Sequence, residues 1–393
     1  MFPPARRCQC TESSTRGRPR PIIVRMNSEH APHPANLLGI DYRQAAVDMG
    51  PPPTPIVDAH LHIGGTRAAE LYRDVATSWG VRHCISMTQL EQVDAVSAAM
   101  GDMVQFIAIP SFSNPDRRVA HGTDFMDRIR TFRALGSKIV KFWCAPRGVE
   151  YGEEVGDPGL LRLDSPVRRD AMDLAASLDM MFMVHIADPD TWFATRYKDA
   201  DRFGTKAAQY DALEELLDLY PVPWIAAHFG GWPEDLDVLD GLLERHPNLH
   251  LDTSATKWMV RELSRHDSVR FASFLTRWSG RILFGSDILT SDDHLVAAPD
   301  GNEMTAKASS LKEAYDLYAS RYWALRTLFE SDYDGPSPIA DPDLEMVDPE
   351  AHGPLDSPTL HGHHLSGELL RMIYADAARG LGLLEPDHSA SKA

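Results

Sequence analysis

Eight short apolar runs, each followed by a stretch with helical periodicity, constrain the fold of this chain more than any other feature. The runs are rich in β-branched residues, and their alternation with helical segments is typical of a parallel sheet built from repeated strand–helix units. The predicted strands are Ile56–His60, Val81–Met87, Val104–Pro110, Lys138–Phe142, Met180–His185, Trp224–His228, Leu249–Asp252 and Ile282–Gly285. The predicted helices are 67–79, 89–100, 123–135, 165–178, 207–220, 234–246, 260–278 and 306–330. Eight such units favour an α/β fold of the closed (β/α)8 TIM-barrel type over an open doubly wound sheet.

Outside these units the composition changes. Residues 1–25 are rich in Pro, Arg and Ser, which favours disorder, and Met26 is an alternative to Met1 as the start. Residues 332–365 carry no period and predict a long loop or an ordered lid, and Glu368–Leu381 is predicted to be a last helix. The four predicted segments are an N-terminal tail, partly disordered (1–54), the barrel (55–331), a C-terminal loop and helix packed on the barrel (332–384) and a tail (385–393).

The chain is strongly acidic, with a net charge of -18. An acidic body repels phosphate backbones and anionic lipids, so we expect a small-molecule substrate and neither nucleic acid nor a membrane as partner. No stretch approaches about 18 apolar residues, no secretory signal is evident, and the four Cys form no CxxC pair, so we expect a cytoplasmic protein with reduced thiols. Assembly into a homo-oligomer stays open.

The motif His60-Leu61-His62 closes the first predicted strand. Strand side chains alternate between faces, so His60 and His62 point the same way and can close on one ion. In barrels of this kind the active site lies at the carboxyl ends of the strands, where this pair stands. Imidazole is the commonest metal ligand in proteins, which makes the pair a candidate metal site.

Three more polar residues stand where other predicted strands end, namely His185, His228 and Asp287. Taken singly, each histidine is compatible with a core residue bonded to a backbone carbonyl, and Asp287 with a helix cap. Taken together, the strand ends of one barrel bring them to its axis, where buried polar side chains need partners. The group therefore predicts a metal centre.

These residues resemble the amidohydrolase superfamily, and within it the amidohydrolase-related branch (family 2), which includes enzymes of the aminocarboxymuconate semialdehyde decarboxylase type. The resemblance covers about residues 55–384. It rests on His60-Leu61-His62, Lys141, His185, His228 and the segment Phe284-Gly285-Ser286-Asp287. Phosphoesterase barrels of the polymerase-and-histidinol-phosphatase type share the opening HxH but close on DxH, whereas Asp287 is followed by Ile288 and Leu289.

The resemblance implies one divalent metal ion, with zinc favoured, held by His60, His62, His185 and Asp287. It implies that Asp287 and His228 are the catalytic residues, with His228 as the acid/base partner. A divalent ion lowers the pKa of water from about 15.7 to about 7, which supplies hydroxide at neutral pH.

Lys141 leaves the number of ions open. In binuclear relatives a lysine of the fourth strand is carboxylated and bridges two ions, and His185 and His228 then bind the second. Otherwise Lys141 contacts an anionic substrate or points outward between helices. The one-ion hypothesis is favoured.

Further candidates follow other strands. Trp143, Arg147 and Trp258 are candidates for substrate binding, and Arg147 suits a substrate carboxylate. Asp58 is a candidate to orient a ligand imidazole through its free N–H. The cluster His361-Gly362-His363-His364 lies in the predicted loop, and because metal sites need a rigid shell, a solvated or capping role is favoured there.

The sequence thus predicts a metal-dependent hydrolase that cleaves a C–O or C–N bond of a small molecule. One alternative is a metal-dependent, non-oxidative decarboxylase of a small carboxylic acid. Some decarboxylase relatives replace the first histidine of HxH by Glu, so His60 favours hydrolysis. The other alternative is a non-catalytic metal-binding barrel. The sequence leaves the substrate and the identity of the metal open.

Overall fold

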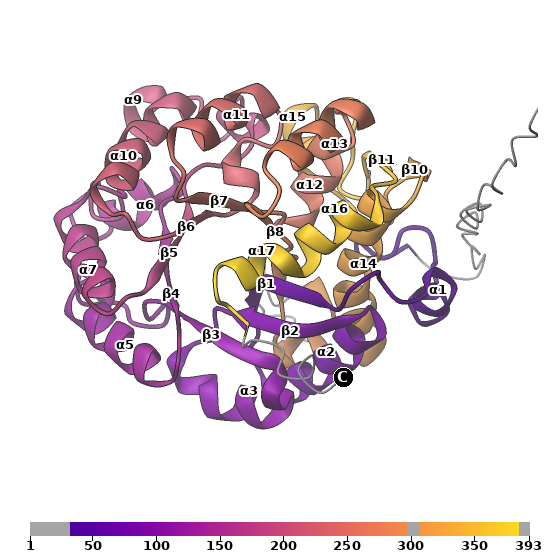
Figure 1. Cartoon of the computed structure of the whole chain (residues 1–393), viewed down its shortest axis with the longest axis horizontal. Helices are drawn as coiled ribbons and strands as arrows, with labels where there is room; N and C mark the ends of the chain where they lie inside the picture. The colour runs from indigo at the N-terminus through magenta and orange to yellow at the C-terminus, as the bar shows by residue number, and fades with distance from the viewer. Residues whose placement is uncertain (1–31, 298–306, 385–393) are drawn as a thin grey trace, which may run out of the picture.

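A curled parallel sheet surrounded by helices makes up the main body of the protein (Figure 1). The structure is a computed structural model and describes residues 32–297 and 307–384. The expectations for residues 1–31 and for the tail 385–393 lie outside the described residues. The arrangement is TIM-barrel-like, with strands running around a ring and helices outside it.

Each of the eight predicted strands is confirmed, and a ninth follows the eighth directly. The strands of the sheet are β1 (Ile56–His62), β2 (Val81–Ser86), β3 (Val104–Ala108), β4 (Ile139–Trp143), β5 (Met181–His185), β6 (Trp224–Ala226), β7 (Leu249–Asp252), β8 (Ile282–Leu283) and β9 (Ile288–Leu289). Their order is β8-β7-β6-β5-β4-β3-β2-β1-β9. Strand β5 is buried along its whole length, which explains why its sequence is a continuous apolar run rather than an alternation.

The connection between β8 and β9 joins the two ends of the sheet. Ala59 N–H of β1 donates to Phe284 O at 2.9 Å, and Asp287 N–H donates to His60 O at 2.9 Å. Because β8 pairs with β7 and β9 pairs with β1, the chain between them lies against both edges. The last strand of the sheet thus brings residues 284–287 next to β1.

The helices follow the strands around the ring. They are α1 (Tyr42–Met49), α2 (Thr66–Ser78), α3 (Val93–Met100), α4 (Arg117–His121), α5 (Thr123–Ala134), α6 (Gly148–Glu153), α7 (Pro166–Ser177), α8 (Asp190–Phe193), α9 (Ala200–Phe203), α10 (Lys206–Leu219), α11 (Leu236–Arg245), α12 (Thr256–Leu263), α13 (Ser268–Arg277) and α14 (Leu311–Glu330). Side-chain caps fix several starts, as at Asp235 before α11 and Ser310 before α14. Within the described residues, no helix is long and apolar enough to cross a membrane.

Two expectations need correction. The segment 260–278 forms two helices rather than one, because Asp267 accepts from the N–H groups of Val269 and Arg270 and starts α13 anew. Of the two alternatives for 332–365, the plain long loop is wrong. The segment contains α15 (Pro342–Val347) and an antiparallel pair, β10 (Asp334–Pro336) with β11 (Thr359–His361).

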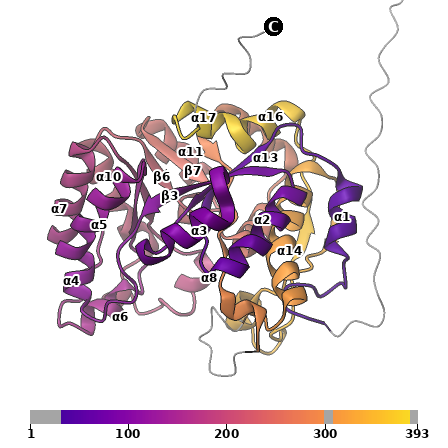
Figure 2. The same ribbon diagram turned by 90° about the horizontal axis from the view of Figure 1, so that it is seen from below.

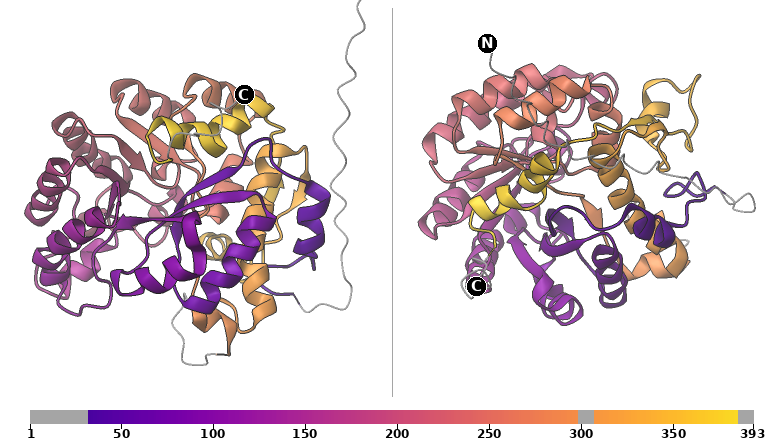
Figure 3. Two further views of the ribbon diagram at one scale, coloured as in Figure 1. Left: turned by 60° about the horizontal axis from the view of Figure 1, so that its bottom comes forward. Right: turned by 45° about the vertical axis from the view of Figure 1, so that its right-hand side comes forward.

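The predicted last helix is present as one continuous helical segment with a π turn, made of α16 (Gly367–Arg371), the turn Met372–Asp376 and α17 (Ala377–Gly380). It lies across one opening of the ring of strands (Figure 3). Phe284 N–H of the β8 end donates to Ile373 O at 3.0 Å. Figure 2 shows α16 and α17 on one side of the sheet, with α6 and α8, which follow β4 and β5, on the opposite side.

We expect Tyr374→Ala to lower the free energy of unfolding by about 3 to 5 kcal/mol, because the buried ring packs edge-on against Phe284 at 5.3 Å. Tyr374→Phe removes only the hydrogen bond from Oη to Glu330 Oε1 and should cost about 1 kcal/mol, since Glu330 still accepts from Arg326. Urea unfolding followed by circular dichroism measures both. An unchanged main transition in Tyr374→Ala would mean that residues 332–384 unfold separately.

Candidate metal centre

Polar side chains from five places in the sheet meet at the carboxyl ends of the strands. They come from the end of β1, the end of β5, the residues after β6, the end of β7 and the connection between β8 and β9. The residues are His60, His62, His185, His228, Asp252, Ser254 and Asp287. Parallel strands bring their carboxyl ends to one edge, so residues far apart in the sequence become neighbours there.

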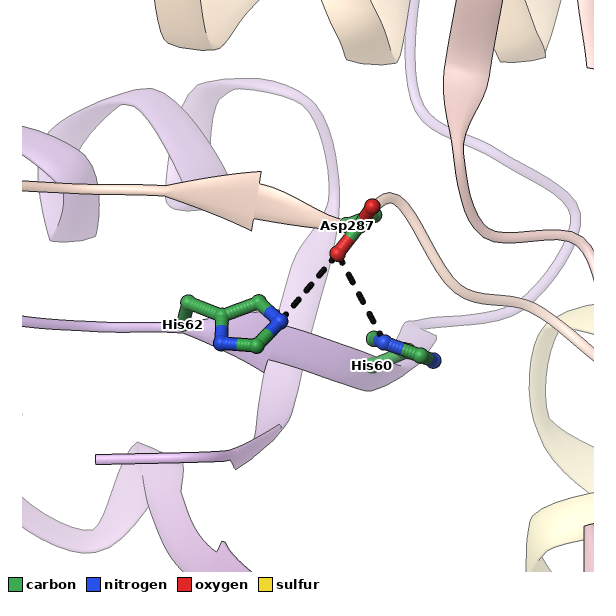
Figure 4. A group of neighbouring side chains, drawn as sticks. All are labelled: His60, His62 and Asp287. Carbon is green, nitrogen blue, oxygen red and sulfur yellow. Dashed lines mark ion pairs between the residues drawn. The ribbon is translucent and has the colours of Figure 1, made fainter. Parts of the chain in front are cut away.

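His60, His62 and Asp287 lie together (Figure 4). The distance from His62 Nε2 to Asp287 Oδ1 is 3.2 Å, and that from His60 Nε2 to the same oxygen is 3.5 Å. The His60 side chain is 1% exposed, whereas those of His62 and Asp287 are 31% and 30% exposed. The group therefore has one buried side and one side open to solvent.

The backbone of the β8–β9 connection is bent so that Asp287 reaches this position. Asp287 has a φ of 58°, in the left-handed region that costs energy for a residue with a Cβ. Gly285 allows the close approach to β1, because a Cβ there would lie 2.9 Å from His60 Cβ. The sequence Gly285-Ser286-Asp287 thus places the carboxylate against β1.

Asp252, at the end of β7, is a residue that sequence analysis missed as a site residue. Its Oδ2 lies 2.8 Å from His60 Nδ1, and both side chains are buried. Burial raises the pKa of Asp252, but His60, together with His228 and Ser254, outweighs this effect and holds the pKa well below its usual range. The available signal was its position, because Asp252 ends a strand as His60 and His185 do.

The Asp252 contact fixes the proton of His60. An ionised carboxylate only accepts hydrogen bonds, so Nδ1 of His60 carries the proton and donates to Asp252. Burial lowers the pKa of His60, with Lys141 acting in the same direction, which keeps the ring neutral. Its Nε2 lone pair then faces Asp287 Oδ1, so that two acceptors point at each other across 3.5 Å. A cation between them satisfies both.

Asp58 does not contact a ligand imidazole, in contrast to the role considered from the sequence. Its Oδ1 accepts from the backbone N–H groups of His60 and Ser286, and its Oδ2 accepts from Tyr322 Oη at 2.8 Å. Burial raises the pKa of Asp58 to about 7. Asp58 therefore fixes the backbone that carries the site, and the imidazole contact belongs to Asp252.

His185 and His228 form a pair beside the first group. His185 Nδ1 lies 3.0 Å from His228 Nε2, and His185 Nε2 lies 2.7 Å from Asp188 Oδ1. Tyr197 Oη donates to the other oxygen of Asp188 at 2.6 Å. Among the described residues, the His/Asp groups whose ligand atoms converge include His228, with His60 and Asp252, but not His185.

Ser254 joins the two parts of the site and was not foreseen from the sequence. Its Oγ lies 2.8 Å from His228 Nδ1 and 3.0 Å from His60 Nδ1, and it also contacts Asp252 Oδ1. Burial, followed by the nearby His185, lowers the pKa of His228 well below its usual value, so this ring is neutral. A continuous hydrogen-bonded chain therefore runs from Asp188 through both histidines to Ser254 and Asp252.

Lys141 is buried in the middle of β4, and its ammonium has no hydrogen-bond partner among the described residues. Burial lowers the pKa of Lys141 to about 8, while Asp252 and Asp287 act in the opposite direction. Because the carboxylates of Asp252 and Asp287 both influence its pKa, Lys141 lies near the site. An unpaired buried cation is costly and is typical of functional sites.

The three substrate-binding candidates lie around the histidine pair. The Trp143 ring is 6.2 Å from the His185 ring, and the Trp258 ring is 5.5 Å from the His228 ring. Arg147 is half-buried, with its guanidinium 5.5 Å from the centre of the Trp143 ring. Trp143 and Trp258 thus lie beside the histidine pair, and Arg147 lies beside Trp143.

The cluster His361-Gly362-His363-His364 lies elsewhere and has a structural explanation in part. His363 is buried, with Nε2 2.9 Å from Leu263 O and Nδ1 2.9 Å from Ser268 Oγ. Its two ring nitrogens are thus both engaged. In the described part of the chain, this cluster is not among the converging His/Asp groups.

Comparisons with known proteins give distant similarities. No family model matches the chain, and no curated protein matches it. Among solved structures, this chain is similar to a 2,6-dihydroxybenzoate decarboxylase from Rhizobium, with 17% identity and a TM-score of 0.36. The match covers 67% of this chain and 98% of that chain. A probable 2-pyrone-4,6-dicarboxylic acid hydrolase from Acinetobacter baumannii has 11% identity, coverage of 69% and 93%, and a TM-score of 0.39. A TatD family hydrolase from Entamoeba histolytica has 9% identity, coverage of 82% and 98%, and a TM-score of 0.38.

We expect Lys141→Met to raise the free energy of unfolding of the metal-free protein at pH 7 by about 3 kcal/mol, because it removes the cost of burying a charged amine. The unfolded lysine has a pKa of about 10.4, so between pH 8 and about 10.4 the unfolded state binds more protons and the native protein gains stability as pH rises. The gain from Lys141→Met should therefore shrink over this range.

Urea unfolding with a chelator at pH 7 and at about pH 9.5 measures this difference. Lys198→Met, at an exposed lysine, is the matched control and should change the free energy of unfolding by less than about 0.5 kcal/mol. A Lys141→Met protein that is less stable than the parent at pH 7, or a gain independent of pH, would contradict the expectation.

Proposed function

We propose that this protein is a metal-dependent hydrolase on a (β/α)8 barrel, which cleaves a C–O or C–N bond of a small molecule. The observation that carries the proposal is the convergence of His60 Nε2, His62 Nε2 and Asp287 Oδ1, with the His60 ring fixed by Asp252. A carboxylate behind a ligating histidine fixes its tautomer and orientation and strengthens the ligand.

The donor set fits a divalent metal ion. The ligand atoms of His60, His62 and Asp287 all lie within 4.8 Å of one another. Two imidazole nitrogens and one carboxylate oxygen suit zinc, and three protein ligands are the usual number where a position must stay open for reaction. His185 remains in the proposed ligand set. Asp188 engages its Nε2, so Nδ1, which lies 3.0 Å from His228 Nε2 in this structure, is the atom that would bind the metal in place of that contact.

The metal, when bound, polarises the bond to be cleaved and lowers the pKa of water. The residues of the chain supply the rest. Asp287 is accessible from the open side, and its carboxylate accepts a proton from the attacking water. His228 is neutral because burial lowers its pKa, so in this proposal it takes up a proton only as negative charge develops on the substrate beside it.

Lys141 supports a second candidate function, the metal-dependent decarboxylation of a small carboxylic acid. Its buried ammonium lacks a hydrogen-bond partner among the described residues, and Arg147 is half-buried nearby beside Trp143. Both cations suit a substrate carboxylate. The same lysine, if carboxylated, would bridge two metal ions, and the number of ions distinguishes these roles.

Metal analysis of the purified full-length protein tests the central claim. We expect about one equivalent of a divalent metal per chain, and Asp287→Ala together with His62→Ala should abolish its retention, because two of the three converging ligands are lost. Two equivalents that fall to one in Lys141→Met would establish the two-ion site. A protein that binds no divalent metal after anaerobic purification would overturn the proposal.

Turnover separates the candidate activities. The wild-type protein is assayed on a panel of lactones and amides for hydrolysis, and on small carboxylic acids for release of carbon dioxide. We expect His228→Ala to lower kcat by at least about a hundredfold with the metal content unchanged, since it removes proton transfer but no proposed ligand. A protein with full metal and no activity on any substrate would favour the non-catalytic barrel.

A further inference from the structure

One carboxylate of the C-terminal segment reaches two tryptophans beside the candidate metal centre. Asp343, in α15, is buried, and its Oδ2 accepts from Trp192 Nε1 at 2.9 Å and from Trp258 Nε1 at 3.1 Å. Trp192 belongs to α8, which follows β5, and Trp258 belongs to α12, which follows β7. Asp343 thus links helices α8 and α12, which follow different strands of the sheet.

Both indoles contact the site or each other edge-on. The Trp258 ring lies 5.5 Å from the His228 ring and 6.3 Å from the His185 ring, at interplanar angles of 87° and 80°. The Trp192 ring lies 6.0 Å from the Trp258 ring at 75°. The Trp258 ring therefore lies against both histidine rings.

The guanidinium of Arg261 forms an ion pair with the Asp343 carboxylate. Arg261 Nη1 lies 3.0 Å from Asp343 Oδ2 and also contacts Asp341, and Arg261 Nη2 donates to Thr191 Oγ1 at 3.2 Å. Trp192 and Trp258 are half-buried, and each indole N–H donates to this one oxygen, so both lose their acceptor if it is removed. Without it, no hydrogen bond holds the terminal torsion of either indole, and such torsions have broad preferences.

We propose that Asp343 is a positioning residue of the substrate site, which holds Trp192 and Trp258 as one wall beside His185 and His228. The C-terminal segment therefore determines which substrates fit, although it contributes no ligand to the converging group. The inference rests on the proposed function insofar as the substrate must bind beside this histidine pair.

The indole N–H resonances test the positioning directly and need no activity. Metal-free protein labelled with 15N at the indole nitrogens is compared with Asp343→Ala, and Trp192→Phe and Trp258→Phe assign the two resonances. In Asp343→Ala we expect both resonances to move upfield and their hydrogens to exchange about tenfold faster or more. Asp343→Asn keeps an acceptor oxygen and should restore at least one of them.

Two internal controls isolate the effect. Trp278 donates to Asp240, and its resonance should not move in either variant. Asp341→Asn alters the same Arg261 ion pair and keeps the cap of α15, but Asp341 contacts neither indole, so both tryptophan resonances should stay in place. Unchanged Trp192 and Trp258 resonances in Asp343→Asn and Asp343→Ala would overturn the positioning role.

Kinetics on a substrate that the wild type turns over test the proposed role of Asp343 in substrate selection. We expect Asp343→Ala to raise KM about tenfold, with a smaller fall in kcat and unchanged metal content, because the wall binds substrate without touching the metal. An unchanged KM with displaced indoles would overturn the role in substrate selection. A wild type without metal or turnover overturns the proposed function, whereas the indole resonances still decide the positioning.

Discussion

The buried contact between His60 and Asp252 is the interaction on which the site depends. It joins the first strand to the seventh across 192 residues, and it sets which nitrogen of His60 faces Asp287. The backbone of His60 is fixed at the same time, because its carbonyl accepts from Asp287 N–H. The same residue, His60, therefore takes part in both the contact between the sheet ends and the candidate metal centre.

The site concentrates features that oppose folding. Lys141 is a buried ammonium without a hydrogen-bond partner among the described residues. His228, Ala255 and Asp287 adopt left-handed backbone conformations at strand ends. Such groups lower stability and persist where the surrounding structure holds them, as at sites where charge and orientation are required for function. The extensive apolar core around them supplies the stability that makes these costs tolerable.

The C-terminal segment acts at both ends of the sheet. Its last helix covers one opening and packs against Phe284 through Tyr374, close in sequence to Asp287. Its first part, α15, reaches the opposite end and places Asp343 on two tryptophans beside the histidines. The segment 332–384, which lies outside the repeated strand–helix units, thus contacts the sheet at one end and the surroundings of the candidate site at the other.

The sequence by itself determined the order of strands and helices. Strands that are buried on both faces leave short continuous apolar runs, whereas amphipathic helices leave a period of about 3.6 residues. The sequence also determined that His60 and His62 share a face, since the period of a strand is two residues. Only the tertiary structure decided that Asp252 rather than Asp58 contacts the His60 ring, that Ser254 links His60 to His228, and that Asp343 reaches the site. These contacts join residues that lie far apart along the chain, and their partners are set by the curvature of the sheet, which no local pattern encodes.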